Sequence, residues 1–255
     1  GQEIVSRLVK QELKVIAVGR NALELEKLKT RFPQVFTFKF DFSGNLSNFA
    51  PEFDAFLLKN QISPGEIGIC YSNAGQGWHL AFDQTTFQRK TASLQINLNS
   101  HICVTDYFLK IFVQRSKQKQ RSALIITSSA SAHLAAKKCH MYHVAKNALS
   151  SLGTALHAEY KRLGVDVLTV HPSAVSSTKF FQSENIKKVG DMGDTKISVT
   201  PQQVVNTMMA RLGKRNSVQV GWFAVAAAIF NSLGRNASAY VFSKSKYGKK
   251  LDKTK

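Results

Sequence analysis

Short apolar segments alternate with helical patterns along this chain, and this alternation narrows the possible folds more than any other feature. Segments such as Lys14–Val18, Ile67–Tyr71 and Val165–Val170 have the length and the β-branched residues of buried strands. Between them lie segments with helical spacing, such as Asn21–Arg31. A strand that returns to the same sheet after a helix lies parallel to its predecessor. We therefore predict an α/β fold with a doubly wound parallel sheet in three layers, α/β/α.

The other predicted elements follow from the same criteria. Further strands are predicted over Val35–Phe40, Ala123–Thr127 and Val218–Val220, and helices over residues 1–10, Phe87–Gln114, Tyr142–Leu163 and Pro201–Leu212. Without repeats or a linker, the 255 residues are predicted to form a single domain, 1–255. Within it lie a segment of little regular pattern at about 173–200 and an apolar, then basic, C-terminal segment at about 218–255.

The net charge of +19 is the unusual bulk property of the chain. Such a charge attracts polyanions, but the Lys and Arg residues are dispersed, with the densest run at Lys244–Lys255 and no nucleic-acid motif. We therefore expect a solvated basic surface and no nucleic acid partner. The longest apolar run, Val220–Phe230, is too short to span a bilayer, so it is a core helix, an interface or a shallow membrane contact. Three scattered cysteines favour a reducing compartment.

One stretch combines three residues suited to proton transfer. Ser129 precedes Tyr142 by thirteen residues, and Lys146 follows Tyr142 by four. On a helix, Tyr142 and Lys146 share one face, so the ammonium can approach the phenol. A cation stabilises phenolate and lowers the pKa of the phenol, while a serine hydroxyl can hold a carbonyl oxygen that receives the proton. A Tyr-x-x-x-Lys pair is also common on solvated helices, so it is weak evidence without further motifs.

Further polar or glycine positions directly follow the predicted strands. Because the carboxyl ends of parallel strands meet at one rim, we expect these positions to lie around a single ligand site. They are Gly19-Arg20, Asp41, Asn73, Ser129 and Pro172.

Together these motifs resemble the short-chain dehydrogenase/reductase family, over nearly the whole chain. The resemblance rests on Ser72-Asn73-Ala74-Gly75 for the Asn-Asn-Ala-Gly element, Asn97 within QINLNS, the Ser129, Tyr142 and Lys146 set, Pro172-Ser173, and Asp41. It implies a Rossmann-like fold and an oxidoreductase that reduces a carbonyl or oxidises the corresponding alcohol.

The resemblance also implies a role for each site residue. Tyr142 would donate the proton, Ser129 would orient the carbonyl oxygen, Lys146 would lower the tyrosine pKa and bind the nicotinamide ribose, and Asn97 would hold a water. The implied cofactor-binding residues are Gly1, Arg20, Asp41, Asn73, Ala74, Gly75, Tyr142, Lys146 and Pro172. Gly19 stands where NAD-preferring members carry an acid, and Arg20 follows it, which favours NADP(H).

The chain departs from the family pattern at its start. The family opens with a central strand and a glycine-rich phosphate loop, of which only the last glycine is matched, by Gly1. We therefore expect the first central strand to be absent from these residues, and the residues to be part of a longer protein. A complete chain would be either a non-catalytic relative or misfolded. Glu12 occupies a turn where glycine is common, which predicts a strained turn.

Substrate and setting are expectations drawn from the family's variable parts. The irregular segment and the apolar, basic C-terminal segment suit an apolar substrate, such as a 3-oxoacyl, ketosphingoid or steroid-like lipid. They also suit a peripheral membrane contact, on the cytoplasmic face of the endoplasmic reticulum or elsewhere in the cytoplasm. A homodimer paired through the long helices is a further expectation. No metal site is expected, because histidines 133, 140 and 143 lack partners at ligand spacing. The alternatives left open are a non-catalytic binding protein and a basic membrane or nucleic-acid binder.

Overall fold

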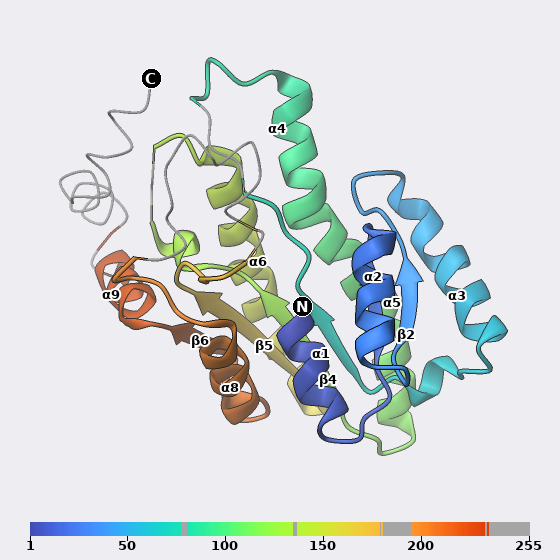
Figure 1. Ribbon diagram of the computed structural model, residues 1–255. Coiled ribbons are helices and arrows are strands. Elements are labelled where there is room, and N and C mark those ends of the chain that lie inside the picture. The colour runs from blue at the N-terminus through green and yellow to red at the C-terminus, as the bar shows by residue number, and fades with distance from the viewer. Residues whose placement is uncertain (78–80, 135–136, 179, 181–194, 233, 235–255) are drawn as a thin grey trace.

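The structure, a computed structural model, describes residues 1–77, 81–134, 137–178, 180, 195–232 and 234 (Figure 1). Its helices are α1 (Gln2–Val9), α2 (Ala22–Arg31), α3 (Phe49–Lys59), α4 (Phe87–Leu94), α5 (Ser100–Lys117), α6 (His140–Tyr160), α8 (Pro201–Arg211) and α9 (Trp222–Ser232). Its strands are β1 (Ile16–Gly19), β2 (Phe36–Lys39), β3 (Ile69–Ser72), β4 (Ser122–Thr127), β5 (Val165–Pro172) and β6 (Ser217–Val220). Each predicted strand is present. The long helix predicted from Phe87 is interrupted by a π-turn at Gln95–Asn99 between α4 and α5.

The strands form two parallel sheets rather than one. β1 pairs with β2, and β3, β4, β5 and β6 pair in that order. The carboxyl ends of all six strands point to the same rim of the molecule (Figure 1). These observations confirm the predicted α/β class and leave a gap between β1 and β3, where the first central strand was predicted to be absent.

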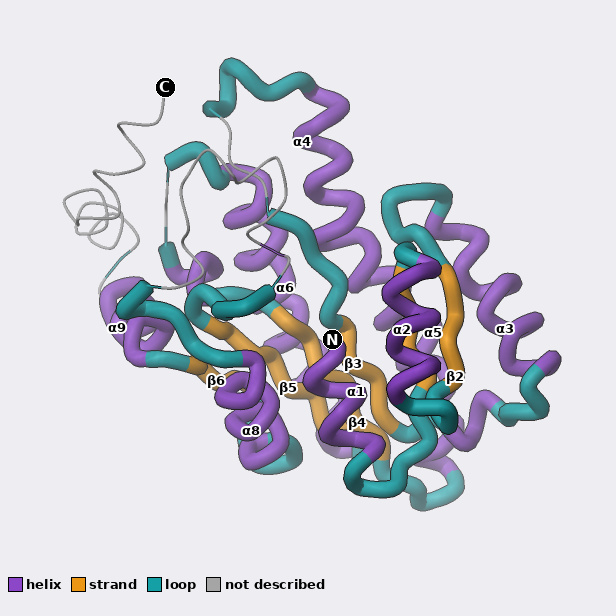
Figure 2. The backbone as a smooth tube through the Cα atoms, viewed as in Figure 1, coloured by secondary structure: helices purple, strands orange, loops and turns teal. Residues whose placement is uncertain are grey.

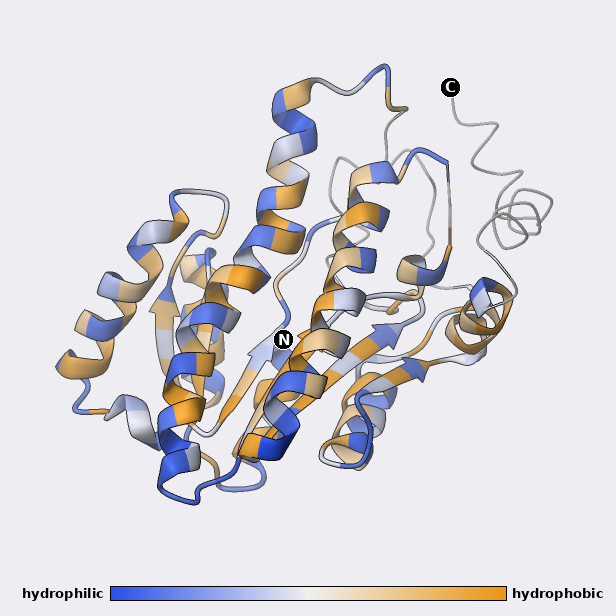
Figure 3. Cartoon of the chain, turned by 180° about the vertical axis from the view of Figure 1, so that it is seen from behind, coloured by the Kyte–Doolittle hydropathy of each residue, from blue (hydrophilic) through white to orange (hydrophobic). Residues whose placement is uncertain are grey.

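Helices cover both faces of the sheets and bury two apolar clusters. On one face, α1, α2 and α8 pack over the first cluster, which includes Ile4, Leu8, Leu28, Ile125, Leu168 and Met208. On the other face, α3, α5 and α6 pack over a second cluster rich in phenylalanine, including Phe49, Phe53, Phe108, Phe112 and Leu149. Seen from behind, the strands are largely hydrophobic while the helices alternate in hydropathy around their axes (Figure 3). The core thus has the three layers predicted.

A cavity of about 1010 Å³ lies between the two sheets. In the backbone view, α1 lies in front of the strands, between α8 and α2 (Figure 2). The cavity walls include the β1 and β3 residues and the inner side of α1. Val18 and Ile69, on the two facing strands, remain 38% and 39% exposed. In the fully paired β4, by contrast, the first five residues are buried. Both cavity walls therefore present apolar side chains beside strand edges that lack a neighbour among the described residues.

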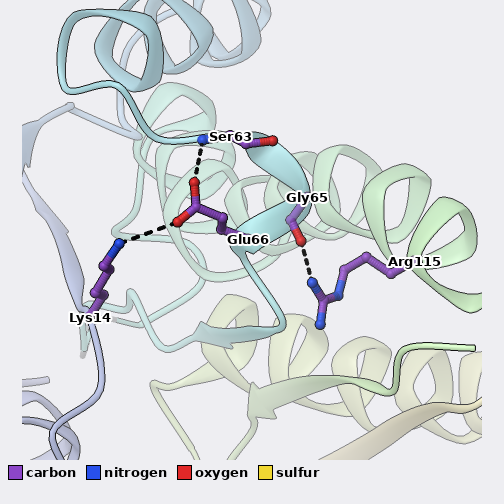
Figure 4. A network of polar contacts seen from close by, with 5 residues as sticks. All are labelled: Lys14, Ser63, Gly65, Glu66 and Arg115. Carbon is purple, nitrogen blue, oxygen red and sulfur yellow. Dashed lines mark hydrogen bonds and ion pairs between the residues drawn. The ribbon is translucent and has the colours of Figure 1, made fainter. Parts of the chain in front are cut away.

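A polar network spans the lower end of this gap (Figure 4). Lys14, just before β1, forms an ion pair with Glu66, 3.4 Å between Nζ and Oε2, and the Ser63 amide donates to Glu66 Oε1 at 2.9 Å. Arg115 of α5 donates to the Gly65 carbonyl and, at 2.9 Å, to the Ser122 hydroxyl. The Lys14–Glu66 pair is exposed, so it contributes little to joining the two sheets.

Side chains at two helix starts satisfy backbone amides of the first turn. The Asn21 side chain caps α2 by accepting from Glu24 N at 3.1 Å, and Thr200 and Gln203 form a capping box at the start of α8. Glu12 adopts a φ of 59°, the left-handed conformation that favours glycine, as the sequence predicted. None of the described helices is long and apolar enough to cross a membrane. The predicted 173–200 and 218–255 segments extend into residues 181–194 and 235–255, which lie outside the described residues.

Candidate active site

The predicted proton-transfer residues meet at the carboxyl end of β4. Ser129 follows this strand and caps the short turn Ala130–His133, while Tyr142 and Lys146 lie one turn apart on α6. The Tyr142 hydroxyl is hydrogen-bonded to the Ser129 side chain. Lys146 Nζ lies 5.7 Å from the centroid of the Tyr142 ring. The structure therefore brings all three side chains together, with the cation beneath the phenol.

Burial controls the ionisation of this pair. Removal from water raises the pKa of Tyr142 to about 12, and the hydrogen bond from Ser129 opposes that shift only in part. Burial lowers the pKa of Lys146, which is 3% exposed, to about 7. Its Nζ donates to the Thr127 carbonyl at 2.9 Å rather than to the phenol. Without further charges at the site, desolvation thus outweighs the expected lowering of the tyrosine pKa by Lys146.

Asn97 lies in the π-turn and is completely buried. Its Oδ1 accepts from the Gln76 amide at 2.9 Å, and its Nδ2 donates to the Gln76 and Ser93 carbonyls at 2.9 and 3.0 Å. π-Turns are frequent at functional sites because they displace one side chain from the regular ladder. Here Asn97 holds the backbone at Gln76, which follows β3.

The turn after β3 passes directly beside Lys146. A Cβ atom added to Gly75 would lie 3.3 Å from Asn97 Oδ1 and 3.6 Å from Lys146 Nζ. Asn73 Oδ1 accepts from the Thr127 hydroxyl at 3.0 Å, so Thr127 contacts both Asn73 and Lys146. The Asn73–Gly75 turn is therefore held close to the proton-transfer residues, as the rim prediction requires.

Sequence reasoning missed His101, which supports this turn from below. His101 is 1% exposed, its Nε2 lies 2.7 Å from the Ala74 carbonyl, and its Nδ1 lies 2.7 Å from the Ser72 hydroxyl. Because a carbonyl only accepts, Nε2 carries the proton and Nδ1 accepts from Ser72. Burial, then the charge of Lys146, lowers the pKa of His101 to about 3. In the sequence, His101 could have been singled out by its position four residues after Asn97, on the same face of a helix.

The predicted nucleotide-side residues lie around the cavity between the sheets. Gly1, Arg20, Asn73 and Ala74 all line it. Asp41, just beyond β2, accepts from the Ser43 amide and hydroxyl at 2.9 and 2.7 Å. These hydrogen bonds and the charge of Arg20 hold the pKa of Asp41 below its usual value. Arg20 and Asp41 are thus neighbours at the ends of β1 and β2.

Pro172 is the last residue of β5, on the far side of the proton-transfer residues from Arg20. The next residue, Ser173, is buried; its amide donates to the Val220 carbonyl at 2.9 Å, and its hydroxyl accepts from the Ala224 amide at 3.1 Å. This serine, in place of the family's glycine, fastens the start of α9 to the end of β5.

The site has the groups needed for acid–base chemistry at a carbonyl. A hydroxyl pair, Ser129 and Tyr142, faces the rim, and a buried amine lies beneath it. Among the described residues, no group of three or more His, Cys, Asp or Glu side chains could hold a metal ion. Arg20 and Asn73 at the rim, and Lys146 beside Gly75, are polar residues that fit a dinucleotide, whereas most of the cavity lining between the sheets is apolar.

Two curated relatives share sequence with this chain. It is 28% identical over 190 residues to "Very-long-chain 3-oxoacyl-CoA reductase-like protein At1g24470" of Arabidopsis thaliana, covering 69% of this chain and 56% of the relative. It is 26% identical over 181 residues to "Very-long-chain 3-oxoacyl-CoA reductase" of Homo sapiens, with the same coverage. The chain thus spans little more than half the length of these relatives.

Solved structures share the fold at low sequence identity. A 3-ketoacyl-(acyl-carrier-protein) reductase from Brucella melitensis complexed with NADH superposes with a TM-score of 0.71 at 16% identity, covering 87% of this chain and 91% of that one. A serine dehydrogenase complexed with NADP+ superposes with a TM-score of 0.72 at 18% identity, covering 86% and 89%. The sequence also matches the family model described as short chain dehydrogenase over residues 1–188. With its parallel sheets, its rim of polar residues and this match, the chain belongs to the short-chain dehydrogenase family.

Proposed function

We propose that the protein is an NADP(H)-dependent reductase of an apolar carbonyl substrate, and that 3-oxoacyl thioesters are the class it prefers. The observation that carries the proposal is the contact of Tyr142 with Ser129 above the buried Lys146. This arrangement places a proton donor and an orienting hydroxyl where a carbonyl oxygen can approach both.

Each residue has a role that follows from its position. When bound, the nicotinamide supplies the hydride to the carbonyl carbon. Ser129 orients the carbonyl oxygen, and Tyr142 donates its proton to that oxygen. Lys146 holds the ribose and, when protonated, stabilises the phenolate left behind. Asn97 keeps the Gln76 backbone, and with it the Asn73–Gly75 turn, in place beside Lys146.

Arg20 supports the preference for NADP(H) over NAD(H). Its exposed side chain follows Gly19 at the end of β1 and lines the cavity, with no acid at position 19 to bind a ribose 2′-hydroxyl. An arginine there can bind a 2′-phosphate. Substitution Arg20→Glu should lower kcat/KM for NADPH by at least about tenfold, the cost of a lost charge-assisted contact. An unchanged NADPH to NADH ratio would reject this assignment.

The proposed lipid substrate class rests on the names of the two curated relatives and on helix α9. Both curated relatives are named for very-long-chain 3-oxoacyl-CoA, and ketosphingoid or steroid-like ketones are the alternatives within the same reaction. Helix α9, which packs against the turn after Ser129, carries an exposed apolar stripe of Trp222, Val225 and Ile229, with Trp222 62% exposed. This stripe, followed in sequence by the lysine-rich tail, supports a peripheral contact with a membrane such as the cytoplasmic face of the endoplasmic reticulum.

The membrane contact has its own test. Flotation with vesicles of phosphatidylcholine and phosphatidylserine should recover the protein, and Trp222→Ser with Ile229→Ser should reduce recovery severalfold. Equal flotation of the variant would show that this stripe does not mediate membrane binding. We also propose that two copies pair through α5 and α6, where Ile102 and Val144 are exposed apolar residues, and sedimentation checks this pairing.

The function itself is tested by following NADPH oxidation at 340 nm with 3-oxoacyl thioesters of increasing chain length. We expect turnover that rises with chain length, and little activity with short polar ketones. NADPH binding without turnover of any lipid ketone would favour the non-catalytic alternative. Salt-dependent polyanion binding with no cofactor affinity would favour the basic binder.

A further inference from the structure

A basic hollow lies between the starts of α4 and α6, next to the proton-transfer residues. Four of its lining side chains are basic: Arg89, Lys90, Lys138 and His140. No acidic residue lines the hollow in the part of the chain that the structure describes; Asp83 of the same loop is exposed and lies outside the lining. The hollow is therefore a local concentration of positive charge on the described part of the chain.

Phe82 forms an aromatic surface within this basic region. Lys90 Nζ lies 3.6 Å from the centroid of the Phe82 ring, and the His140 ring meets it edge-on at 5.5 Å and 87°. The ring is nevertheless 51% exposed. An exposed aromatic ring beside cations suits a ligand that combines a planar heterocycle with phosphate groups, since the ring stacks and the cations pair.

The hollow adjoins the catalytic residues through two direct connections. His140 and Met141, which line it, immediately precede Tyr142 on α6. Ser93, which also lines it, accepts a hydrogen bond from Asn97 through its carbonyl. A flexible ligand whose reactive carbonyl lies at Tyr142 can therefore place a distant charged group here.

We infer that this hollow binds the phosphorylated adenosine handle of a coenzyme A thioester, with Arg89, Lys90 and His140 facing the phosphates and Phe82 beneath the adenine. The inference rests on the proposed function, and it names the carrier on which the 3-oxoacyl chain arrives. The pantetheine arm would run from the hollow toward Ser129 and Tyr142, and the acyl chain would extend beyond them.

The experiment compares two thioesters of the same 3-oxoacyl chain, one on coenzyme A and one on N-acetylcysteamine, which lacks phosphate and adenine. In the double variant Arg89→Glu, Lys90→Glu, kcat/KM for the coenzyme A thioester should fall by at least about tenfold, the effect of losing a charge-assisted contact. The value for the N-acetylcysteamine thioester should stay within about twofold of wild type, because neither residue touches the reacting atoms. Free 3′-phosphoadenosine 5′-diphosphate should inhibit wild type and not the variant.

The matched control is Lys10→Glu with Lys59→Glu, which changes the net charge equally at two exposed sites, directly after α1 and at the end of α3. It should leave both thioesters unaffected. Equal loss for both thioesters in the hollow variant, or no loss for either, overturns the inference while the reductase activity stands. Sensitivity seen only with an acyl carrier protein thioester also overturns it, in favour of a protein partner. Failure of wild type to reduce either thioester would instead reject the proposed function.

Discussion

The two sheets of this molecule differ in how completely they are built. In the four-stranded sheet, β4 and β5 have a partner on each side, and helix α6, which carries Tyr142 and Lys146, packs against β5. In the two-stranded sheet, β1 has one partner and faces a cavity of about 1010 Å³. The acid–base half of the site belongs to the first sheet, and the nucleotide side, with Gly1, Arg20 and Asp41, belongs to the second.

This difference indicates that the acid–base half of the site is held in place independently of the nucleotide half. Ser129, Tyr142, Lys146 and Asn97 are held by contacts within the four-stranded sheet and its helices. The position of Arg20 relative to them depends on α1, which packs on both sides of the gap, and on the exposed network around Glu66. An extended parallel strand in the cavity would pair with the free edges of β1 and β3 and fix that position.

Amide hydrogen exchange should show the largest contrast between the two sheets. Amides of β4 are expected to exchange at least about 100-fold more slowly than those of β1, because their opening requires global rather than local unfolding. The measurement is exchange mass spectrometry or NMR on the isolated protein. Equal protection of β1 and β4 would show that a partner already closes the gap.

His101 should make the stability of the four-stranded half decrease in acid. Its pKa is about 3 when folded and near 6.5 when unfolded, so the unfolded chain binds more protons between these values. The stabilisation is complete above pH 6.5 and is lost as pH falls toward 3, by at most about 1.4 kcal/mol per pH unit.

The variant His101→Gln should lose that part of the pH dependence in urea unfolding at several pH values. The control His157→Gln, near the end of α6, should keep it. A pH slope unchanged by His101→Gln would contradict the assignment of a neutral, buried imidazole.

Gly153 tests the close packing that positions α6. An added Cβ atom would lie 1.9 Å from Thr169 Oγ1 of β5, so Gly153→Ala should force the helix or the threonine to move. We expect a loss of about 1–3 kcal/mol in the free energy of unfolding, together with reduced turnover. Ser151→Ala, on the exposed side of the same helix, is the control and should be nearly neutral. Wild-type stability in Gly153→Ala would show that the α6–β5 contact is looser than described.

We expect the smallest change in stability at Glu12, which lies in the half of the molecule with the two-stranded sheet. Replacement by glycine removes the strain of a φ of 59° and should raise the free energy of unfolding by about 0.5–1 kcal/mol. Glu12→Ala keeps the strain and should give no gain, which urea denaturation of both variants can establish.

Much of the fold was predictable because it depends on local patterns. Apolar strand segments ended where polar residues began, and Asn21 and Pro201 marked the starts of two helices. The π-turn at Gln95–Asn99 was not predicted, because hydropathy spacing does not reveal one extra residue in a helical ladder. The family resemblance located Tyr142, Lys146, Ser129 and Asn97, and the contacts of Tyr142 with Ser129 and Lys146 support the roles proposed for these three.

The effect of burial on the pKa values of the site could not be predicted from the sequence. The i, i+4 spacing suggested that Lys146 lowers the tyrosine pKa, but both groups are desolvated and the amine bonds to the Thr127 carbonyl. His101 and Thr127 were missed because their partners lie far away in the chain. The basic hollow around Phe82 was missed for the same reason, since α4 and α6 are separated by more than forty residues of sequence.

The most direct measurement is NADPH binding and NADPH-dependent turnover in Tyr142→Phe, beside Tyr160→Phe at the other end of the same helix. The account predicts that Tyr142→Phe binds NADPH within about twofold of wild type, while kcat with a 3-oxoacyl thioester falls by about 10²–10⁴-fold, the range for a lost general acid. Tyr160→Phe should retain both properties. Unchanged turnover in Tyr142→Phe would contradict the claim that this tyrosine donates the proton.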